Sequence, residues 1–257
     1  MPIQDYRVPT KVIPSGSQFA ERNLRQKRSN RVAYWRLNPA PGDGSDVVEE
    51  LVQTAANCSG TPASIVWDRD NRSPANLLAP EFDGSSSTID LYSAQLDSAI
   101  SKTEATISVW AKVANSGVWS DSTKRVILHL GADGDNYFEI SRTTTNDQVR
   151  AEYKAGGTSK TVDISTLVSG ESPVQWVHYC MVVSVVGDTL DFYVNGTAGT
   201  QATSLGTWAG SLNSDLTVVG SSALGTPADV WSGYIAELGI WSTPLSAAEV
   251  YNLANIV

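Results

Sequence analysis

Short stretches of the chain alternate apolar and polar residues, which is the pattern of half-buried β-strands. Within residues 106–113 the odd-numbered positions are apolar, whereas Ser108, Trp110 and Lys112 point to the opposite face. The same alternation recurs at 149–154, 190–195 and 234–240. In the last stretch we expect one shared face for Tyr234, Ala236, Leu238 and Ile240.

The segments between these stretches are rich in Gly, Asp, Asn and Ser, and no helical pattern of ten or more residues separates them. Residues 174–186 add a long, mostly apolar run, and Asn195-Gly196 supplies a turn pair. Many short strands with regular turns are typical of a sandwich or barrel. We therefore expect residues 32–257 to form one all-β domain of two packed antiparallel sheets.

One helix signal is clear near the end of the chain. Ser246 and Glu249 have the spacing of a capping box, in which each side chain can bond the other residue's backbone amide. Leu245 and Val250 occupy the hydrophobic-staple positions around it. The sequence predicts a short C-terminal helix that ends by Asn255.

Charge divides the 257-residue chain unequally. Residues 1–31 hold seven basic and two acidic residues, a charge of +5, whereas residues 32–257 carry −14. The net charge of −9 argues against a nucleic-acid binder. We interpret residues 1–31 as an extended basic arm that docks on a neighbouring subunit. The residues expected to make this contact are Phe19, Arg22, Leu24, Arg25, Lys27, Arg28 and Arg31.

The N-terminal residues and the two cysteines indicate the compartment and the redox chemistry of the protein. The opening MPIQDYRVPTKVIPSG is polar and rich in proline, unlike a signal peptide, and no run of 18 apolar residues occurs. We therefore expect a soluble protein made in the cytoplasm, without a membrane partner. Two cysteines, Cys58 and Cys180, allow one disulfide at most, and Cys180 lies in an apolar strand-like run that favours a buried thiol.

Five segments of residues 32–257 resemble the laminin-G-like, concanavalin A-like lectin/glucanase superfamily, in that family's own order. They are Val32–Pro39 (VAYWRLNP), Phe82-Asp83-Gly84 with Ile89–Leu91, Thr106–Val113 (TISVWAKV), Trp176–Gly196 (WVHYCMVVSVVGDTLDFYVNG) and Gly233–Val250 (GYIAELGIWSTPLSAAEV). The resemblance implies a jelly-roll sandwich with a closing strand and helix. Jelly-roll modules of this superfamily are widespread in bacteria and phages.

Several families of this superfamily are glycoside hydrolases, whose mechanism needs two positioned carboxyl groups. In the laminarinase-like branch these lie in an E-x-D-x-x-E run, which this sequence lacks. The strand-like segments carry Glu139, Glu152, Asp191 and Glu237, each alone. We therefore expect a protein that is not an enzyme.

The loop Gly131–Asn136 (GADGDN) has the oxygen-rich composition of a calcium rim loop, but hairpin turns favour the same residues. We favour the turn, expect no cofactor, and keep calcium as the alternative. His129 and His178 form no zinc pattern, and both are interpreted as structural residues. His129 should point away from Val126, Leu128 and Leu130 if that strand is regular.

Three tryptophans, Trp119, Trp208 and Trp231, fall in loops or at loop edges. Such indoles stack on sugar rings, bury in interfaces, or cover the ends of a core. We favour core or interface over sugar.

Two functions remain. The first is a structural protein of an assembly, expected to be a phage virion surface component such as a capsid decoration protein, head fibre or tail appendage. Such a protein would form a homo-oligomer, anchored by the basic arm. The second is a carbohydrate-binding lectin or adhesion module that contacts a surface glycan.

Overall fold

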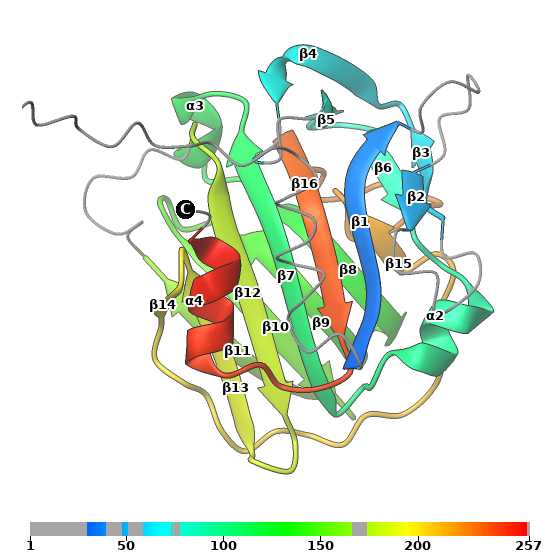
Figure 1. The fold of residues 1–257 in the computed structure, drawn as a ribbon, viewed down its shortest axis with the longest axis vertical. Helices are drawn as coiled ribbons and strands as arrows, with labels where there is room; N and C mark the ends of the chain where they lie inside the picture. The colour runs from blue at the N-terminus through cyan, green and yellow to red at the C-terminus, as the bar shows by residue number, and fades with distance from the viewer. Residues whose placement is uncertain are drawn as a thin grey trace, which may run out of the picture.

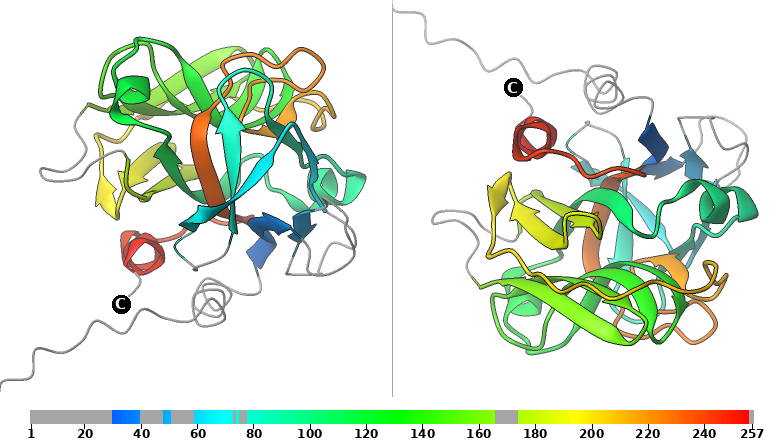
Figure 2. Two further views of the ribbon diagram at one scale, coloured as in Figure 1. Left: turned by 90° about the horizontal axis from the view of Figure 1, so that it is seen from above. Right: turned by 90° about the horizontal axis from the view of Figure 1, so that it is seen from below.

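The computed structural model describes residues 30–39, 48–50, 59–72, 74, 78–165 and 174–255. Within them the chain forms two antiparallel sheets packed face to face (Figures 1 and 2). Sheet A has the order β14-β13-β12-β7-β16-β1-β2; in addition, β5 pairs with β16 and β4 pairs with β5. Sheet B has the order β11-β10-β9-β8-β15-β6-β3. The expected all-β sandwich is confirmed.

The strands and helices have the following bounds. Sheet A contains β1 (Arg31–Pro39), β2 (Val48–Glu50), β4 (Val66–Arg72), β5 (Leu78–Asp83), β7 (Glu104–Val113), β12 (Val177–Ser184), β13 (Thr189–Val194), β14 (Thr197–Ala198) and β16 (Ser232–Trp241). Sheet B contains β3 (Thr61–Ala63), β6 (Thr88–Asp90), β8 (Arg125–Asp133), β9 (Asn136–Arg142), β10 (Val149–Ala155), β11 (Thr158–Ile164) and β15 (Thr217–Val219). The described helices are α2 (Ala94–Ala99), α3 (Ser116–Trp119) and α4 (Ala247–Ala254).

The core lies between the sheets, and strand alternation supplies it. Every second residue of β10 is buried, and the apolar positions of β7 and β13 enter the same cluster. Its large side chains include Trp35, Phe82, Phe138, Tyr153, Phe192 and Trp231. The alternation predicted for these three strands is confirmed.

The predicted alternation is wrong for β16. Glu237 adopts φ 55°, and the pairing with β7 shifts between Ala236 and Gly239. This bulge inserts a residue, so Leu238 and Ile240 enter the core whereas Tyr234 and Ala236 do not.

The C-terminal helix α4 is confirmed, with its capping box formed by Ser246 and Glu249. Figure 1 shows α4 in front of β12, on the outer face of sheet A. There it completes a second apolar cluster of Cys180, Val182, Tyr193, Trp241, Leu245, Val250 and Leu253. Cys180 is a buried free thiol, and Cys58 lies outside the described residues. No described helix is long and apolar enough to span a membrane.

Gly220, which follows β15 of sheet B, lies against Phe82 of sheet A, so a substitution there tests how the two sheets pack. Gly220 has φ 84°, and a β-carbon there would lie 2.1 Å from Cε1 of the buried Phe82. We expect Gly220→Ala to lower the free energy of unfolding by about 2 kcal/mol or more, since overpacking and a positive φ both cost energy. A β-carbon added at Gly134 would have no neighbouring atom within 4 Å, so Gly134→Ala is the control. Equal urea midpoints for the two variants would contradict the packing.

Candidate functional site

The outer face of sheet B carries a row of polar side chains. Because strands alternate, Arg150, Glu152 and Lys154 of β10 point away from the core that the other residues of β10 enter. On β9 they pair with Ser141, Glu139 and Tyr137, and on β11 with Asp163, Thr161 and Ser159. Figure 2 shows no described helix over this face. Polar groups of three neighbouring strands are therefore presented together.

The register brings together two carboxylates that the sequence places in separate strands. Glu139 and Glu152 are directly paired between β9 and β10. Directly paired residues of antiparallel strands have β-carbons about 4.5–5.5 Å apart. In the sequence each glutamate stands alone on its strand, because the register between strands is not visible in a single strand.

Glu139 is a buried anion with its oxygens occupied. Lys124 Nζ lies 3.0 Å from Oε1, the Ser141 hydroxyl donates to Oε1 at 2.9 Å, and His129 Nδ1 lies 3.2 Å from Oε2. Burial alone would raise the pKa of Glu139, but the contacts with His129 and Lys124 outweigh it and lower the pKa. Glu139 is therefore held as a carboxylate.

Glu152 is more open. Its Oε1 accepts hydrogen bonds from Tyr137 at 2.9 Å and from Ser159 at 2.6 Å. Next to it, Arg150 donates from Nε and Nη2 to Asp163 at 2.6 and 2.7 Å. In the described part of the chain, neither Glu152 Oε2 nor Arg150 Nη1 makes a hydrogen bond.

A cavity of about 180 Å³ opens between these groups. It is lined by Lys124, Glu139, Ser141, Thr143, Thr144, Arg150 and Glu152. Thr144, in the turn between β9 and β10, is exposed. The cavity offers a carboxylate oxygen, a guanidinium nitrogen and hydroxyl groups to a polar ligand.

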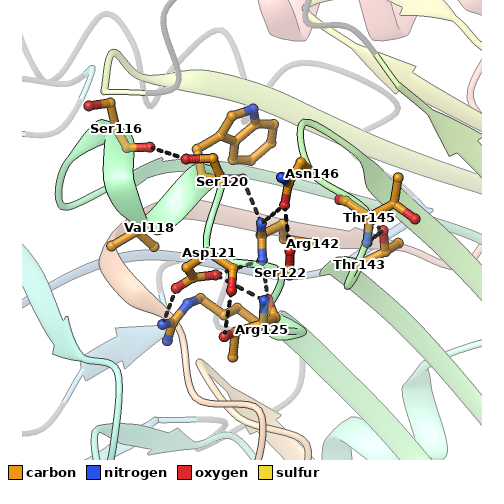
Figure 3. Close-up of polar contacts among 12 residues, drawn as sticks. Ser116, Val118, Ser120, Asp121, Ser122, Arg125, Arg142, Thr143, Thr145 and Asn146 are labelled. Carbon is orange, nitrogen blue, oxygen red and sulfur yellow. Dashed lines mark hydrogen bonds and ion pairs between the residues drawn. The ribbon is translucent and has the colours of Figure 1, made fainter.

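A buried arginine, Arg142, ends β9, and Figure 3 shows its polar contacts. Arg142 follows Phe138 and Ile140 on the core side of β9 and is fully buried. Its guanidinium donates to the carbonyl of Trp119 at 2.6 and 3.0 Å, to Asp121 Oδ1 at 2.9 Å, and to the carbonyl of Thr123. Burial lowers the pKa of Arg142, and the charge of Asp121 opposes the shift.

These bonds fix the segment that leads into β8. Asp121 also accepts from Arg125 at 2.7 Å, and Arg125 donates to the carbonyl of Val230 at 3.1 Å. Lys124 comes directly after the anchored residue Thr123 and reaches Glu139 on the outer face. Arg142 therefore positions Lys124 from inside the sandwich.

The predicted arm contacts fall mostly outside the described residues. Phe19, Arg22, Leu24, Arg25, Lys27 and Arg28 lie there, so their contacts stay a prediction. Arg31 is placed differently: it is the first residue of β1, pairs with Trp241 and is 6% exposed. Its backbone belongs to sheet A, because the β1–β16 ladder begins at this residue.

The Gly131–Asn136 segment forms the β8–β9 hairpin, as favoured: Gly131–Asp133 end β8, Gly134 and Asp135 form the turn, and Asn136 begins β9. Asp133 Oδ1 accepts from the amide of Asp135 and from Asn136 Nδ2, at 2.8 and 2.9 Å. Asn136 Oδ1 accepts from the amides of Gly156 and Ala209, each at 2.9 Å. Asp133 Oδ1 and Asn136 Oδ1 thus hold the hairpin and its neighbouring loops together. No group of three metal-ligating side chains occurs among the residues the structure describes.

The two histidines occupy different environments. His178 is fully buried in β12, lies 2.8 Å from the Ser108 hydroxyl through Nε2, and has its pKa lowered to about 3 by burial. It is structural, as predicted. His129 lies on the outer face of sheet B beside Glu139. A bulge between Val126 and Leu128 gives Val126 the orientation of His129, so the strand is not regular there and the expected opposition to His129 holds for Leu128 and Leu130 only.

The three loop tryptophans pack on the core, as favoured. Trp119 is 5% exposed and Trp231 is fully buried. Trp208 is half-buried and stacks on Phe138 with ring centroids 5.0 Å apart. None of the three lines the cavity.

Comparisons with known proteins agree with the observed fold. The family model Laminin_G_3, of the concanavalin A-like lectin/glucanases superfamily, matches residues 83–251. No curated protein sequence matches the chain.

Solved structures share the fold at low sequence identity. The receptor-binding domain of the botulinum neurotoxin C/D mosaic serotype has a TM-score of 0.64 at 11% identity, over 88% of this chain and 51% of that one. Domain 4 of AbnA, a GH43 extracellular arabinanase from Geobacillus stearothermophilus in complex with arabinotriose, has a TM-score of 0.59 at 16% identity, over 88% and 98%. The binding domain of Paraclostridial Mosquitocidal Protein 1 has a TM-score of 0.61 at 18% identity, over 89% and 52%. The chain spans about half the length of the matched toxin domains.

The Arg142 anchor can be tested by stability. We expect Arg142→Met to lower the free energy of unfolding by about 3–5 kcal/mol, because the buried carbonyls and Asp121 lose their donor. Arg150→Met, which removes an exposed ion pair, should cost only about 0–1 kcal/mol. Urea unfolding followed by tryptophan fluorescence measures both. A loss below about 1 kcal/mol for Arg142→Met would contradict the anchor.

Proposed function

The chain belongs to the Laminin_G_3 family of the concanavalin A-like lectin/glucanases superfamily, and from this premise we propose that it is a non-catalytic carbohydrate-binding domain. The glycan contacts the outer face of sheet B. The observation that carries the proposal is the cavity on the outer face of β9 and β10, lined by hydroxyl, carboxylate and cationic side chains. Sugars present dense hydroxyl groups, which such side chains recognise by hydrogen bonds.

The structural relatives support a binding role. The arabinanase domain was solved with arabinotriose, and the botulinum neurotoxin domain is described as receptor-binding. They share the sandwich with this chain at 11–16% identity, so the likeness concerns the scaffold. The ligand of this chain is inferred from its own cavity.

The protonation state of Glu139 supports sugar binding without hydrolysis. Glycoside hydrolysis needs a carboxylic acid that donates a proton, which requires a raised pKa. Glu139 instead has a lowered pKa and accepts hydrogen bonds at both oxygens. Glu139 is therefore unsuited to acid catalysis, whereas Glu152 Oε2 is open to a ligand hydroxyl.

A glycan array followed by calorimetry tests the proposal. We expect binding of one or more neutral glycans without release of reducing sugar. Thr144→Trp, at the exposed rim of the cavity, should weaken binding at least tenfold by filling the space. Thr197→Trp, on the exposed β14 of sheet A, is the matched control. A blank array, equal affinities of both variants, or steady sugar release would each contradict the proposal.

Charge favours a second candidate, the structural protein of an assembly. Residues 1–31 carry +5 and the remaining residues −14, so the arm of one subunit suits the acidic surface of another. In this proposal the sandwich is displayed on a phage virion surface, as a decoration protein, head fibre or tail appendage. The protein forms a homo-oligomer there, and glycan adhesion is compatible with the display.

Deleting the arm tests this second candidate. A variant lacking residues 1–30 keeps all of β1, so we expect it to fold while it no longer enters its oligomer or particle. Exposed ion pairs contribute only about 0–1 kcal/mol each, so apolar arm residues such as Phe19 and Leu24 must add to the contact. Light scattering and particle incorporation measure assembly. Equal assembly of both chains would reject the arm as an anchor.

A further inference from the structure

The cavity is too small to enclose a whole sugar chain. Its volume is about 180 Å³, below the roughly 300–1,000 Å³ of pockets that enclose small molecules. One edge of a single ring fits this space. The groups at its mouth therefore decide which ring edge is accepted.

Hydrogen bonding, and not stacking, dominates at this mouth. Tyr137 is the aromatic residue on the outer face of β9, and its hydroxyl donates to Glu152. Its ring lies 4.9 Å from the His129 ring, and Lys154 Nζ lies 5.9 Å from its centroid. These neighbours already occupy the ring, so a sugar is recognised through its hydroxyl groups.

The groups left open form a donor–acceptor pair. Glu152 Oε2 and Arg150 Nη1 have no hydrogen bond within the described residues and belong to side chains on the same face of β10. A carboxylate accepts a hydrogen bond from one hydroxyl, and a guanidinium donates a hydrogen bond to the oxygen of the next. Two neighbouring hydroxyl groups satisfy both at once.

Charge around the cavity selects against anionic sugars. Both of its cations already have carboxylate partners: Arg150 is paired with Asp163, and Lys124 with Glu139 and Asp229. Glu152 adds a further carboxylate. With the cations neutralised, a ligand carboxylate or sulfate at this mouth meets uncompensated negative charge.

We propose that the cavity on the outer face of β9 and β10 binds the edge of one uncharged sugar ring through two neighbouring hydroxyl groups held by Arg150 and Glu152, and that it discriminates against uronic acids. The proposal rests on the glycan-binding function proposed above and specifies its ligand class.

The experiment uses the full chain labelled with ¹⁵N and titrated with methyl glycosides. The probes are methyl glucoside, galactoside and mannoside, each paired with its uronic acid counterpart. We expect amide shifts at Thr144, Arg150 and Glu152 with the neutral sugars and about tenfold weaker binding of the uronides. Glu152→Gln keeps the shape and an acceptor oxygen but removes the charge, so it should reduce this discrimination to about twofold.

Glu81→Gln is the matched control, because Glu81 lies in β5 of sheet A and the net charge changes equally. Its discrimination should equal that of the unmodified chain. Uronides that bind as tightly as neutral sugars, or equal discrimination by both variants, would overturn the inference and leave glycan binding intact. Neutral glycosides without any shift, despite a glycan bound on the array, would overturn it as well. A blank array together with no shift rejects the proposed function itself.

Discussion

Arg142 brings a full positive charge into the end of the core, where it is stable only with several acceptors around it. Two backbone carbonyls and the carboxylate of Asp121 provide them, all from the segment between β7 and β8. The charge therefore fixes that segment against β9. Lys124 follows it directly and is thereby held over Glu139 on the outer face of sheet B. A constraint inside the sandwich thus sets the geometry of a site outside it.

The sequence predicted the fold well where strands are regular. In β7, β10 and β13, alternation alone assigns each side chain to the core or to the outer face, and the structure agrees. The alternation does not hold at Glu237 in β16 and at Val126 in β8, because a bulge in each strand shifts it by one residue. The composition of these segments does not indicate a bulge. The short helices α2 and α3 were also missed. Their N-caps, Ser93 and Asn115, precede runs of only six and four residues, too short for a helical period.

The site was harder to predict, because it depends on the register between strands. Glu139 and Glu152 are 13 positions apart in the chain and become neighbours only when β9 pairs with β10. Once paired they differ: Glu139 is saturated with donors, whereas Glu152 keeps an oxygen for a ligand. The buried position of Arg142, by contrast, could have been predicted from the sequence pattern of β9. It continues the inward positions of Phe138 and Ile140, and a charged residue at an inward position indicates a buried polar network.

The outer faces of the two sheets are built for different neighbours. On sheet A, α4 covers an apolar cluster that includes Cys180 and Trp241, so part of that face is closed by the chain itself. On sheet B the outer positions of β9 and β10 are polar and line an open cavity. Asn30, where the described chain begins, accepts a hydrogen bond from the amide of Ser242 just after β16, and the next residue starts β1 in sheet A. The described chain therefore enters the sandwich in sheet A, the layer opposite the cavity. Because β1 and the cavity lie in different layers, the proposed sugar contact on sheet B uses no residue of the strand with which the described chain begins.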